Sequence, residues 1–196
     1  MLTKNISFIN FNYKKKKNYV KSFLNKILKQ NNEVINSLRS SYKSSYNHKI
    51  FKFFKKNLDY RIIGMGGSSL GAQAIYDFLK IKIKKKFTFI DNLNAFENKK
   101  VKKNYNNLII SKSGNTTETI VNANILIKKK DKNLFITEKK NSYLSLLAQK
   151  LKAEVIDHNN YIGGRYSVLS EVGMLPAELM GLNHKKFRQL NNLVKN

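Results

Sequence analysis

From Asp59 onward, short β-rich runs alternate with segments of helical spacing, and this alternation constrains the fold of the 196-residue chain more than any other feature. Such alternation is typical of βαβ units and a parallel sheet. We expect five strands, at residues 61–65, 87–91, 107–111, 133–137 and 154–157. Right-handed crossovers would stack the intervening helices on both faces. The sequence therefore predicts an α/β fold, a doubly wound five-stranded parallel sheet with the flavodoxin-like order 2-1-3-4-5.

The chain before this pattern is basic and helical. Five apolar residues fall at helical spacing and form one stripe: Val20, Phe23, Leu24, Ile27 and Leu28. We interpret the stripe as an amphipathic helix that covers an edge or face of the main domain, although a helix lying on a membrane surface has the same pattern. The predicted organisation is a basic helical extension over 1–57, an α/β domain over 58–184 and a polar tail over 185–196.

The chain is strongly basic, with 38 Lys and Arg against 12 Asp and Glu and a formal net charge of +26. The excess is nearly all lysine, accompanied by many Asn and Ile, which is the bias of an AT-rich coding sequence. We therefore read the charge mainly as composition. Weak, salt-sensitive attraction to polyanions or anionic lipid is the alternative. No specific nucleic-acid partner is expected, because aromatic residues do not interleave with the lysines as base-stacking platforms would.

The chain contains no cysteine, which suits a reducing compartment, and we expect a cytoplasmic protein. The first 17 residues hold no apolar run ahead of their lysines, so no secretion signal is expected. No run approaches the roughly 18 apolar residues that a spanning helix needs, so no membrane span is expected.

A glycine-rich segment follows the first predicted strand, from Gly64 to Gly71. Glycines at a strand-to-helix junction let backbone N–H groups approach an anion, and the helix N-terminus adds a partial positive charge. The segment half-fits the dinucleotide fingerprint, in which case Asp91 would meet a ribose, but Ser69 stands at the third glycine position. A tight turn without a ligand is the plainer interpretation.

A hydroxyl-rich segment, Ser111-Lys112-Ser113-Gly114-Asn115-Thr116-Thr117-Glu118-Thr119, follows the third predicted strand. Its short donors can surround the oxygens of a phosphate. Glu118 lies three residues after Asn115, so we expect a capping box with Asn115 as the N-cap. In the order 2-1-3-4-5, this segment and the glycine-rich one leave neighbouring strands and would face one pocket. An ordinary N-cap with hydroxyls in solvent is the alternative.

A third segment, Gly163-Gly164-Arg165, follows the fifth predicted strand. Two glycines let the chain turn sharply and would hold Arg165 beside the same crevice. An arginine there can stabilise an oxyanion that develops during a reaction. The alternative is a surface arginine that pairs with a helix end.

The three segments together resemble the glucose-6-phosphate isomerase (phosphoglucose isomerase) family, in its N-terminal sugar isomerase (SIS) domain. The resemblance covers roughly residues 58–183 and rests on the order and spacing of residues 66–71, 111–119 and 163–177. The first two segments resemble sugar isomerase domains generally, and the third is particular to phosphoglucose isomerases. The resemblance implies an enzyme of glycolysis and gluconeogenesis that interconverts glucose 6-phosphate and fructose 6-phosphate through a cis-enediol.

The resemblance also implies roles for individual residues. The implied ligands of the substrate phosphate are Ser111, Lys112, Ser113 and Thr116. Gly67 and Ser68 would line the sugar end, and Arg165 would be the catalytic residue beside the cis-enediolate. No metal and no nucleotide cofactor is implied. The sugar phosphate is the expected partner, together with a second copy in a homodimer.

The glutamate, histidine and lysine that the family uses for proton transfer and ring opening belong to motifs beyond the arginine segment, and residues 1–196 do not contain those motifs. We expect Glu171 and His184 to be surface residues without a role. The chain is therefore expected to bind sugar phosphate but to be catalytically incomplete without a complementary C-terminal half. A non-catalytic sugar-phosphate-binding SIS module is the alternative.

Overall fold

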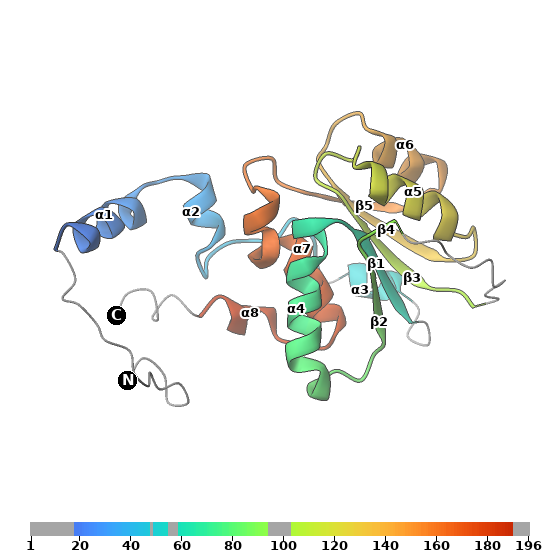
Figure 1. Ribbon diagram of the computed structural model, residues 1–196, viewed down its shortest axis with the longest axis horizontal. Coiled ribbons are helices and arrows are strands. Elements are labelled where there is room, and N and C mark those ends of the chain that lie inside the picture. The colour runs from blue at the N-terminus through green and yellow to red at the C-terminus, as the bar shows by residue number, and fades with distance from the viewer. Residues whose placement is uncertain (1–17, 48, 55–58, 94–102, 190–196) are drawn as a thin grey trace. The chain divides into compact units, whose positions relative to one another are not determined.

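The computed structural model describes residues 18–47, 49–54, 59–93 and 103–189. Its centre is a five-stranded sheet in the order β2-β1-β3-β4-β5, with every neighbouring pair parallel (Figure 1). The strands are β1 (Tyr60–Gly64), β2 (Phe87–Ile90), β3 (Asn106–Ile110), β4 (Lys132–Thr137) and β5 (Glu154–Asp157). The predicted strand order is confirmed, and each predicted strand agrees with the observed one to within a residue at either end.

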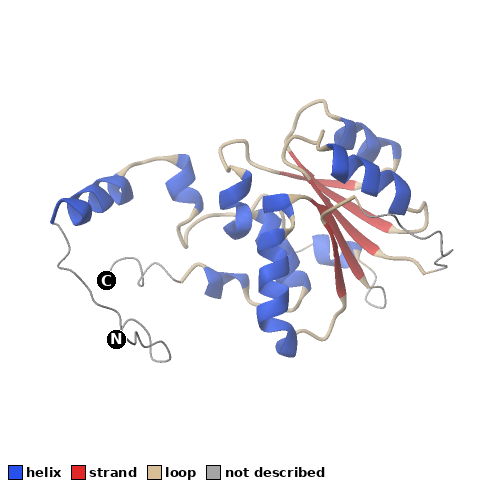
Figure 2. Ribbon diagram, viewed as in Figure 1, coloured by secondary structure: helices blue, strands red, loops and turns tan. Residues whose placement is uncertain are grey.

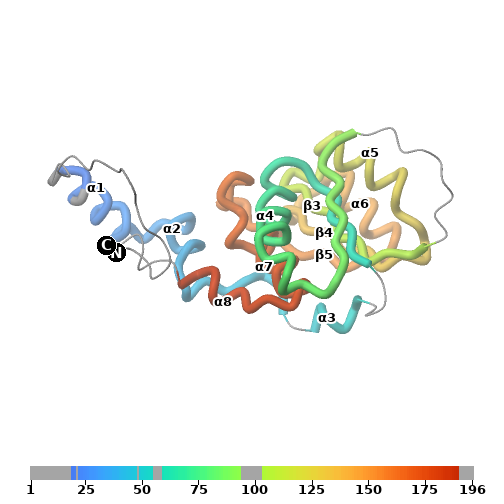
Figure 3. Tube along the Cα trace, turned by 60° about the horizontal axis from the view of Figure 1, so that its bottom comes forward, coloured from blue at the N-terminus to red at the C-terminus, as the bar shows by residue number. Residues whose placement is uncertain are grey.

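Helices precede, connect and follow the strands. They are the 3-10 turns η1 (Gly66–Ser68), η2 (Lys80–Lys82) and η3 (Gly164–Leu169) and the α-helices α3 (Ile50–Phe53), α4 (Leu70–Leu79), α5 (Thr117–Leu126), α6 (Tyr143–Lys150), α7 (Glu171–Leu179) and α8 (His184–Phe187). α5 and α6 cover one face of the sheet, while α4 and α7 lie side by side on the other (Figures 2 and 3). Helices on both faces confirm the doubly wound α/β fold.

The two faces have separate apolar cores because successive side chains of a strand point to opposite faces. Ile62 and Leu108 belong to the core beneath α4 and α7, which also holds Leu175. Their neighbours Ile63 and Ile109 belong to the core beneath α5 and α6. Both faces are therefore covered, as a parallel sheet requires.

A buried polar network lies at the amino ends of the central strands. Asp131 accepts hydrogen bonds from Arg61 Nη2 at 3.3 Å, from Asn107 Nδ2 at 2.9 Å and from the backbone N–H of Tyr105 at 2.9 Å. Arg61 Nε also donates to Asn107 Oδ1 at 2.9 Å. Asp131 and Arg61 are both buried, so the ion pair is screened little by solvent.

Contacts divide the chain into two compact units, Lys43–His184 and a second that combines Met1–Tyr42 with Lys185–Asn196. The second unit contains α1 (Asn18–Lys29) and α2 (Glu33–Ser37). α1 confirms the expected helix, and Phe23 of its apolar stripe is exposed. The covering role of that helix and the boundaries at 57 and 184 stay predictions. Among the described helices, none combines the length and apolar character that crossing a membrane requires.

Candidate active site

Residues 111–116, here called the hydroxyl loop, follow β3 directly. Ser111 Oγ lies 2.9 Å from Thr116 Oγ1, and Ser113 Oγ lies 3.5 Å from the same atom. The backbone turns at Gly114, whose φ of 68° favours glycine. The Gly114 N–H donates to the carbonyl and to the hydroxyl of Ser111, both at 3.2 Å. Three hydroxyls therefore converge at the carboxyl end of β3.

The hydroxyl loop ends at the N-terminus of α5. Thr116 is the N-cap residue, and its side chain makes no capping hydrogen bond. The first N–H groups of an α-helix have no partner within the helix and, with the helix dipole, favour an anion. Hydroxyls and helix N–H groups thus lie at one place, which suits an oxyanion with several oxygens.

The expected capping box between Asn115 and Glu118 is wrong. Asn115 Oδ1 instead accepts from the backbone N–H of Tyr143 at 2.9 Å, a contact across 28 residues. A capping box occurs at the next helix, where Ser142 and Ser145 bond one another's backbone N–H groups. The side chain of Asn115 therefore joins the hydroxyl loop to α6.

The glycine-rich loop after β1 packs closely against the arginine segment. A Cβ added to Gly67 would lie 2.0 Å from the carbonyl oxygen of Gly164 and 3.2 Å from the backbone nitrogen of Arg165. Ser167 Oγ lies 2.7 Å from the Gly164 carbonyl and 3.2 Å from the Gly67 carbonyl. A Cβ at Gly71 would also collide with Val168. The glycines of this loop thus make room for η3, a role that sequence reasoning did not assign to them.

The glycine-rich loop and the hydroxyl loop leave adjacent strands. Gly64 is the register partner of Ile110, and a Cβ on Gly64 would lie 2.8 Å from the Ile110 carbonyl and 3.0 Å from Ser68 Cβ. Ser68 therefore lies over the end of β1, beside the residue that precedes Ser111. The expected placement of the two loops at the switch point of the sheet is confirmed.

Arg165 lies in the first turn of η3 and is exposed. Within the described part of the chain, its side chain makes no hydrogen bond or ion pair, so the alternative of an arginine paired with a helix end finds no support there. Because the backbone of Arg165 packs against Gly67, the side chain of Arg165 projects from a point beside the glycine-rich loop. The guanidinium is thus available to a ligand.

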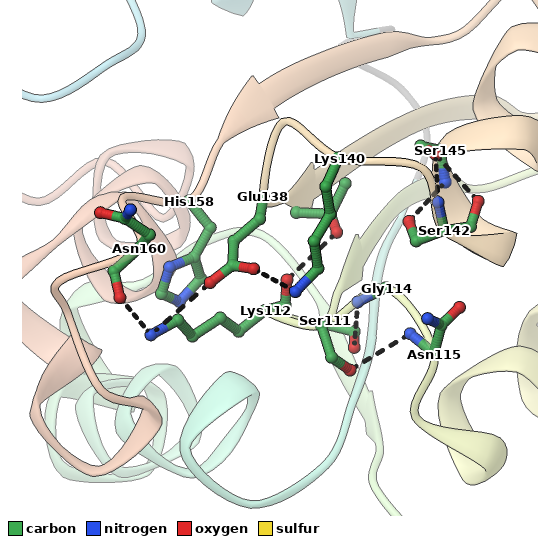
Figure 4. A network of polar contacts seen from close by, with 12 residues as sticks. Ser111, Lys112, Gly114, Asn115, Glu138, Lys140, Ser142, Ser145, His158 and Asn160 are labelled. Carbon is green, nitrogen blue, oxygen red and sulfur yellow. Dashed lines mark hydrogen bonds and ion pairs between the residues drawn. The ribbon is translucent and has the colours of Figure 1, made fainter.

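Lys112 differs from the other expected phosphate ligands, because its side chain extends away from the hydroxyl of Ser111 (Figure 4). Lys112 Nζ donates to the carbonyl oxygen of Asn160 at 2.5 Å and lies 3.6 Å from Glu138 Oε1. Glu138 and Asn160 follow β4 and β5, and sequence reasoning missed both. Their place at the ends of strands on the same side of β3 is the signal that could have found them.

Glu138 and His158 line a surface pocket of about 330 Å³ beside Lys112, with Lys140 and Asn160 on its walls. A hydrogen bond from Lys140 lowers the pKa of Glu138, and the charge of Lys112 acts in the same direction. Burial lowers the pKa of His158, which lies at the end of β5. Both pKa shifts favour, near neutral pH, the carboxylate form of Glu138 and the neutral form of His158.

The expectation that Glu171 is a surface residue is wrong. Glu171 is fully buried at the start of α7, and its Oε1 accepts from the backbone N–H of Ser45 at 2.8 Å. The residue fastens the segment before α3 to α7. His184 is partly exposed, and its Nδ1 contacts the Glu178 carboxylate. In the described ranges, no group of three or more His, Cys, Asp and Glu side chains is placed to hold a metal ion.

Comparison with known proteins agrees with this geometry. A family model described as Phosphoglucose isomerase matches residues 13–194. The glucose-6-phosphate isomerase of Acholeplasma laidlawii is 36% identical over 156 residues, which are 67% of this chain and 36% of that protein. The chain thus spans about a third of the length of this curated relative.

Two crystal structures share the fold. A hypothetical protein from Thermus thermophilus has a TM-score of 0.66 at 19% identity, over 87% of this chain and 45% of that one. The tagatose-6-phosphate ketose/aldose isomerase of Escherichia coli has a TM-score of 0.58 at 17% identity, over 80% and 49%. The SIS-type sheet is confirmed. Since the family match covers more than nine-tenths of the sequence and the three motifs each follow a strand of the same sheet, the chain belongs to the phosphoglucose isomerase family.

Proposed function

We propose that this chain carries the phosphate-binding part of a glucose-6-phosphate isomerase, which interconverts glucose 6-phosphate and fructose 6-phosphate. The observation that carries the proposal is the convergence of Ser111, Ser113 and Thr116 hydroxyls at the N-terminus of α5. A phosphate dianion there would accept hydrogen bonds from hydroxyls and from helix N–H groups, and bonds to a charged acceptor are the stronger kind. Lys112 would join as a cation.

The sugar end of the substrate would lie toward Gly67 and Ser68. Proton movement between C2 and C1 passes through a cis-enediolate, whose charge the exposed guanidinium of Arg165 would stabilise. The sequence contains no cysteine and therefore no disulfide, which suits a reducing compartment, and we propose that the protein works in the cytoplasm.

Transfer of a carbon-bound proton also needs a base within hydrogen-bond reach of the carbon. Two of the carboxylates near these loops already have other partners: Glu171 accepts from Ser45, and Glu138 is paired with Lys112 and Lys140. We therefore infer that residues 1–196 bind the substrate and that a complementary C-terminal half supplies the base.

Thr116→Val tests the phosphate site. The change keeps the shape of the side chain and removes the hydroxyl on which Ser111 and Ser113 converge. We expect affinity for fructose 6-phosphate, measured by calorimetry, to fall about tenfold or more, because a hydrogen bond to a charged group contributes roughly 1.5–3 kcal/mol. Thr88→Val, at an exposed threonine of β2, is the matched control and leaves affinity unchanged. Equal affinities of all three proteins would contradict the proposed site.

An isomerase assay tests the catalytic part. We expect the 196-residue polypeptide to bind fructose 6-phosphate without converting it, and to gain turnover when a family C-terminal half is added. Turnover by the polypeptide alone that Arg165→Ala abolishes would show that the base lies within it. Binding without turnover in the complemented mixture would favour a non-catalytic sugar-phosphate-binding module.

A further inference from the structure

Among the expected phosphate ligands, Lys112 is the only cation, and it is held by groups on the far side of the hydroxyl loop. Its ammonium bonds the Asn160 carbonyl at 2.5 Å and lies 3.6 Å from Glu138 Oε1 (Figure 4). The side chains of Lys112 and Glu138 are 30% and 15% exposed, so the pair is screened less than a fully solvated one.

Backbone contacts keep Glu138 beside Lys112. The Glu138 N–H donates to the Lys112 carbonyl at 3.2 Å, and Thr137 Oγ1 donates to the same oxygen at 3.4 Å. The main chains of the two residues are thus joined where β3 and β4 end. These bonds fix the two backbones and leave the side chain of Lys112 to be held by its own contacts, with the Asn160 carbonyl and Glu138.

Glu138 does not depend on Lys112 alone for a partner. Lys140 Nζ forms a closer ion pair with Glu138 Oε2, on the second carboxylate oxygen. Leaving a partly buried carboxylate unpaired is costly, but Lys140 would keep Glu138 paired after Lys112 moved away. The arrangement therefore lets Lys112 leave at small cost.

We propose that Glu138 is a positioning residue that, with the Asn160 carbonyl, tethers the Lys112 ammonium beside β5, so that a phosphate at the hydroxyl loop competes with Glu138 for it. The inference rests on the proposed function for the identity of the anion. It assigns Glu138 a restraining effect: the carboxylate sets how weakly the loop binds a phosphate, and its removal strengthens binding.

A double-mutant cycle measures the tether. Glu138→Gln keeps the size of the side chain and one acceptor oxygen, and removes its charge. We expect inorganic phosphate to bind Glu138→Gln about threefold more tightly than wild type, the size of effect typical of a partly exposed ion pair. In a Lys112→Met background, the same change should alter affinity by less than about 1.5-fold, since no ammonium is left to release. Glu154→Gln, at an exposed carboxylate of β5, controls for net charge and should bind like wild type.

Nuclear magnetic resonance of the Lys112 side-chain amine, without any ligand, gives a second readout. We expect the ammonium to be ordered in wild type and mobile in Glu138→Gln. Equal mobility in both proteins would overturn the tether.

The affinities separate the tether from two other roles for Glu138. If Glu138→Gln raised the affinity for phosphate equally with and without the Lys112→Met change, Glu138 would act only by repelling the phosphate. Weaker binding by Glu138→Gln would make Glu138 a residue that presents Lys112 to the ligand. Either result overturns the proposal. If wild type binds no phosphate, the proposed function fails, and the ligand-free mobility still decides whether Glu138 holds Lys112.

Discussion

Asp131 illustrates how a single residue can hold several elements in a parallel sheet. One carboxylate receives the guanidinium of Arg61 from β1, the amide of Asn107 from β3 and the backbone N–H of Tyr105. The burial of these charges is tolerable because each has several partners. Removal of one partner would leave the other charge buried and uncompensated.

We expect Asp131→Ala to lower the free energy of unfolding by about 3–5 kcal/mol, the usual cost of breaking a buried ion pair. Urea denaturation followed by circular dichroism measures the change. Asp59→Ala is the matched control, because Asp59 pairs with the half-exposed Lys103 at 2.7 Å. A solvent-exposed pair contributes little to stability, so we expect a much smaller loss for Asp59→Ala. Similar losses in both variants would show that the burial of the pair does not decide its contribution.

At the scale of elements, the packing of η3 against the glycine-rich loop sets where Arg165 stands. Gly67 meets the Gly164 carbonyl with no space for a methyl group, whereas a Cβ on Gly164 itself would meet nothing within 4 Å. The two glycines belong to the same contact, but only Gly164 has space for an added methyl group. They form a matched pair for mutation.

We expect Gly67→Ala to destabilise the domain by roughly 1–3 kcal/mol, because overpacking forces the backbone of η3 to move. Gly164→Ala should be neutral or slightly stabilising, since the added methyl group lies in open space and restricts the unfolded chain. Thermal unfolding of the two variants distinguishes them. Equal melting temperatures would mean that η3 is not fixed by Gly67.

Sequence patterns predicted the elements better than the contacts between them. The strands follow from apolar runs and helical spacing, which are local signals, whereas their order came from the doubly wound pattern. The cap at α5 was mispredicted because Asn115 is occupied by Tyr143 of α6. Glu171 was expected at the surface because its partner, Ser45, lies 126 residues away. The hydroxyl loop was predicted from its residues. The contact of Lys112 with Asn160 was not, because the two residues are far apart in the chain and meet only in the folded sheet.

At the scale of the whole molecule, the net charge of +26 would attract a large polyanion only through weak contacts that salt disrupts. We expect the protein to bind generic duplex DNA at low ionic strength and to lose roughly 10³-fold or more in affinity between about 50 and 200 mM salt, because the attraction comes from counterion release. Fluorescence anisotropy across a salt series measures this loss. Tight binding that persists at high salt would contradict the view that the charge is compositional.

The pairing of β1 with β3 has a consequence for how the protein reaches its native state. The β1–β3 pair joins Tyr60 to Asn106. These residues lie farther apart in the chain than the partners in the β1–β2 pair (Tyr60 and Phe87) or in the β3–β4 pair (Asn106 and Lys132). Contacts between residues far apart in the chain cost more loop-closure entropy and tend to form late. We expect β1–β2 and β3–β5 to fold as two early units, with amides at their junction protected last in pulsed hydrogen exchange. Because the hydroxyl loop follows β3 and the glycine-rich loop follows β1, the proposed sugar-phosphate site would form only when these two strands pair, in the last step of folding.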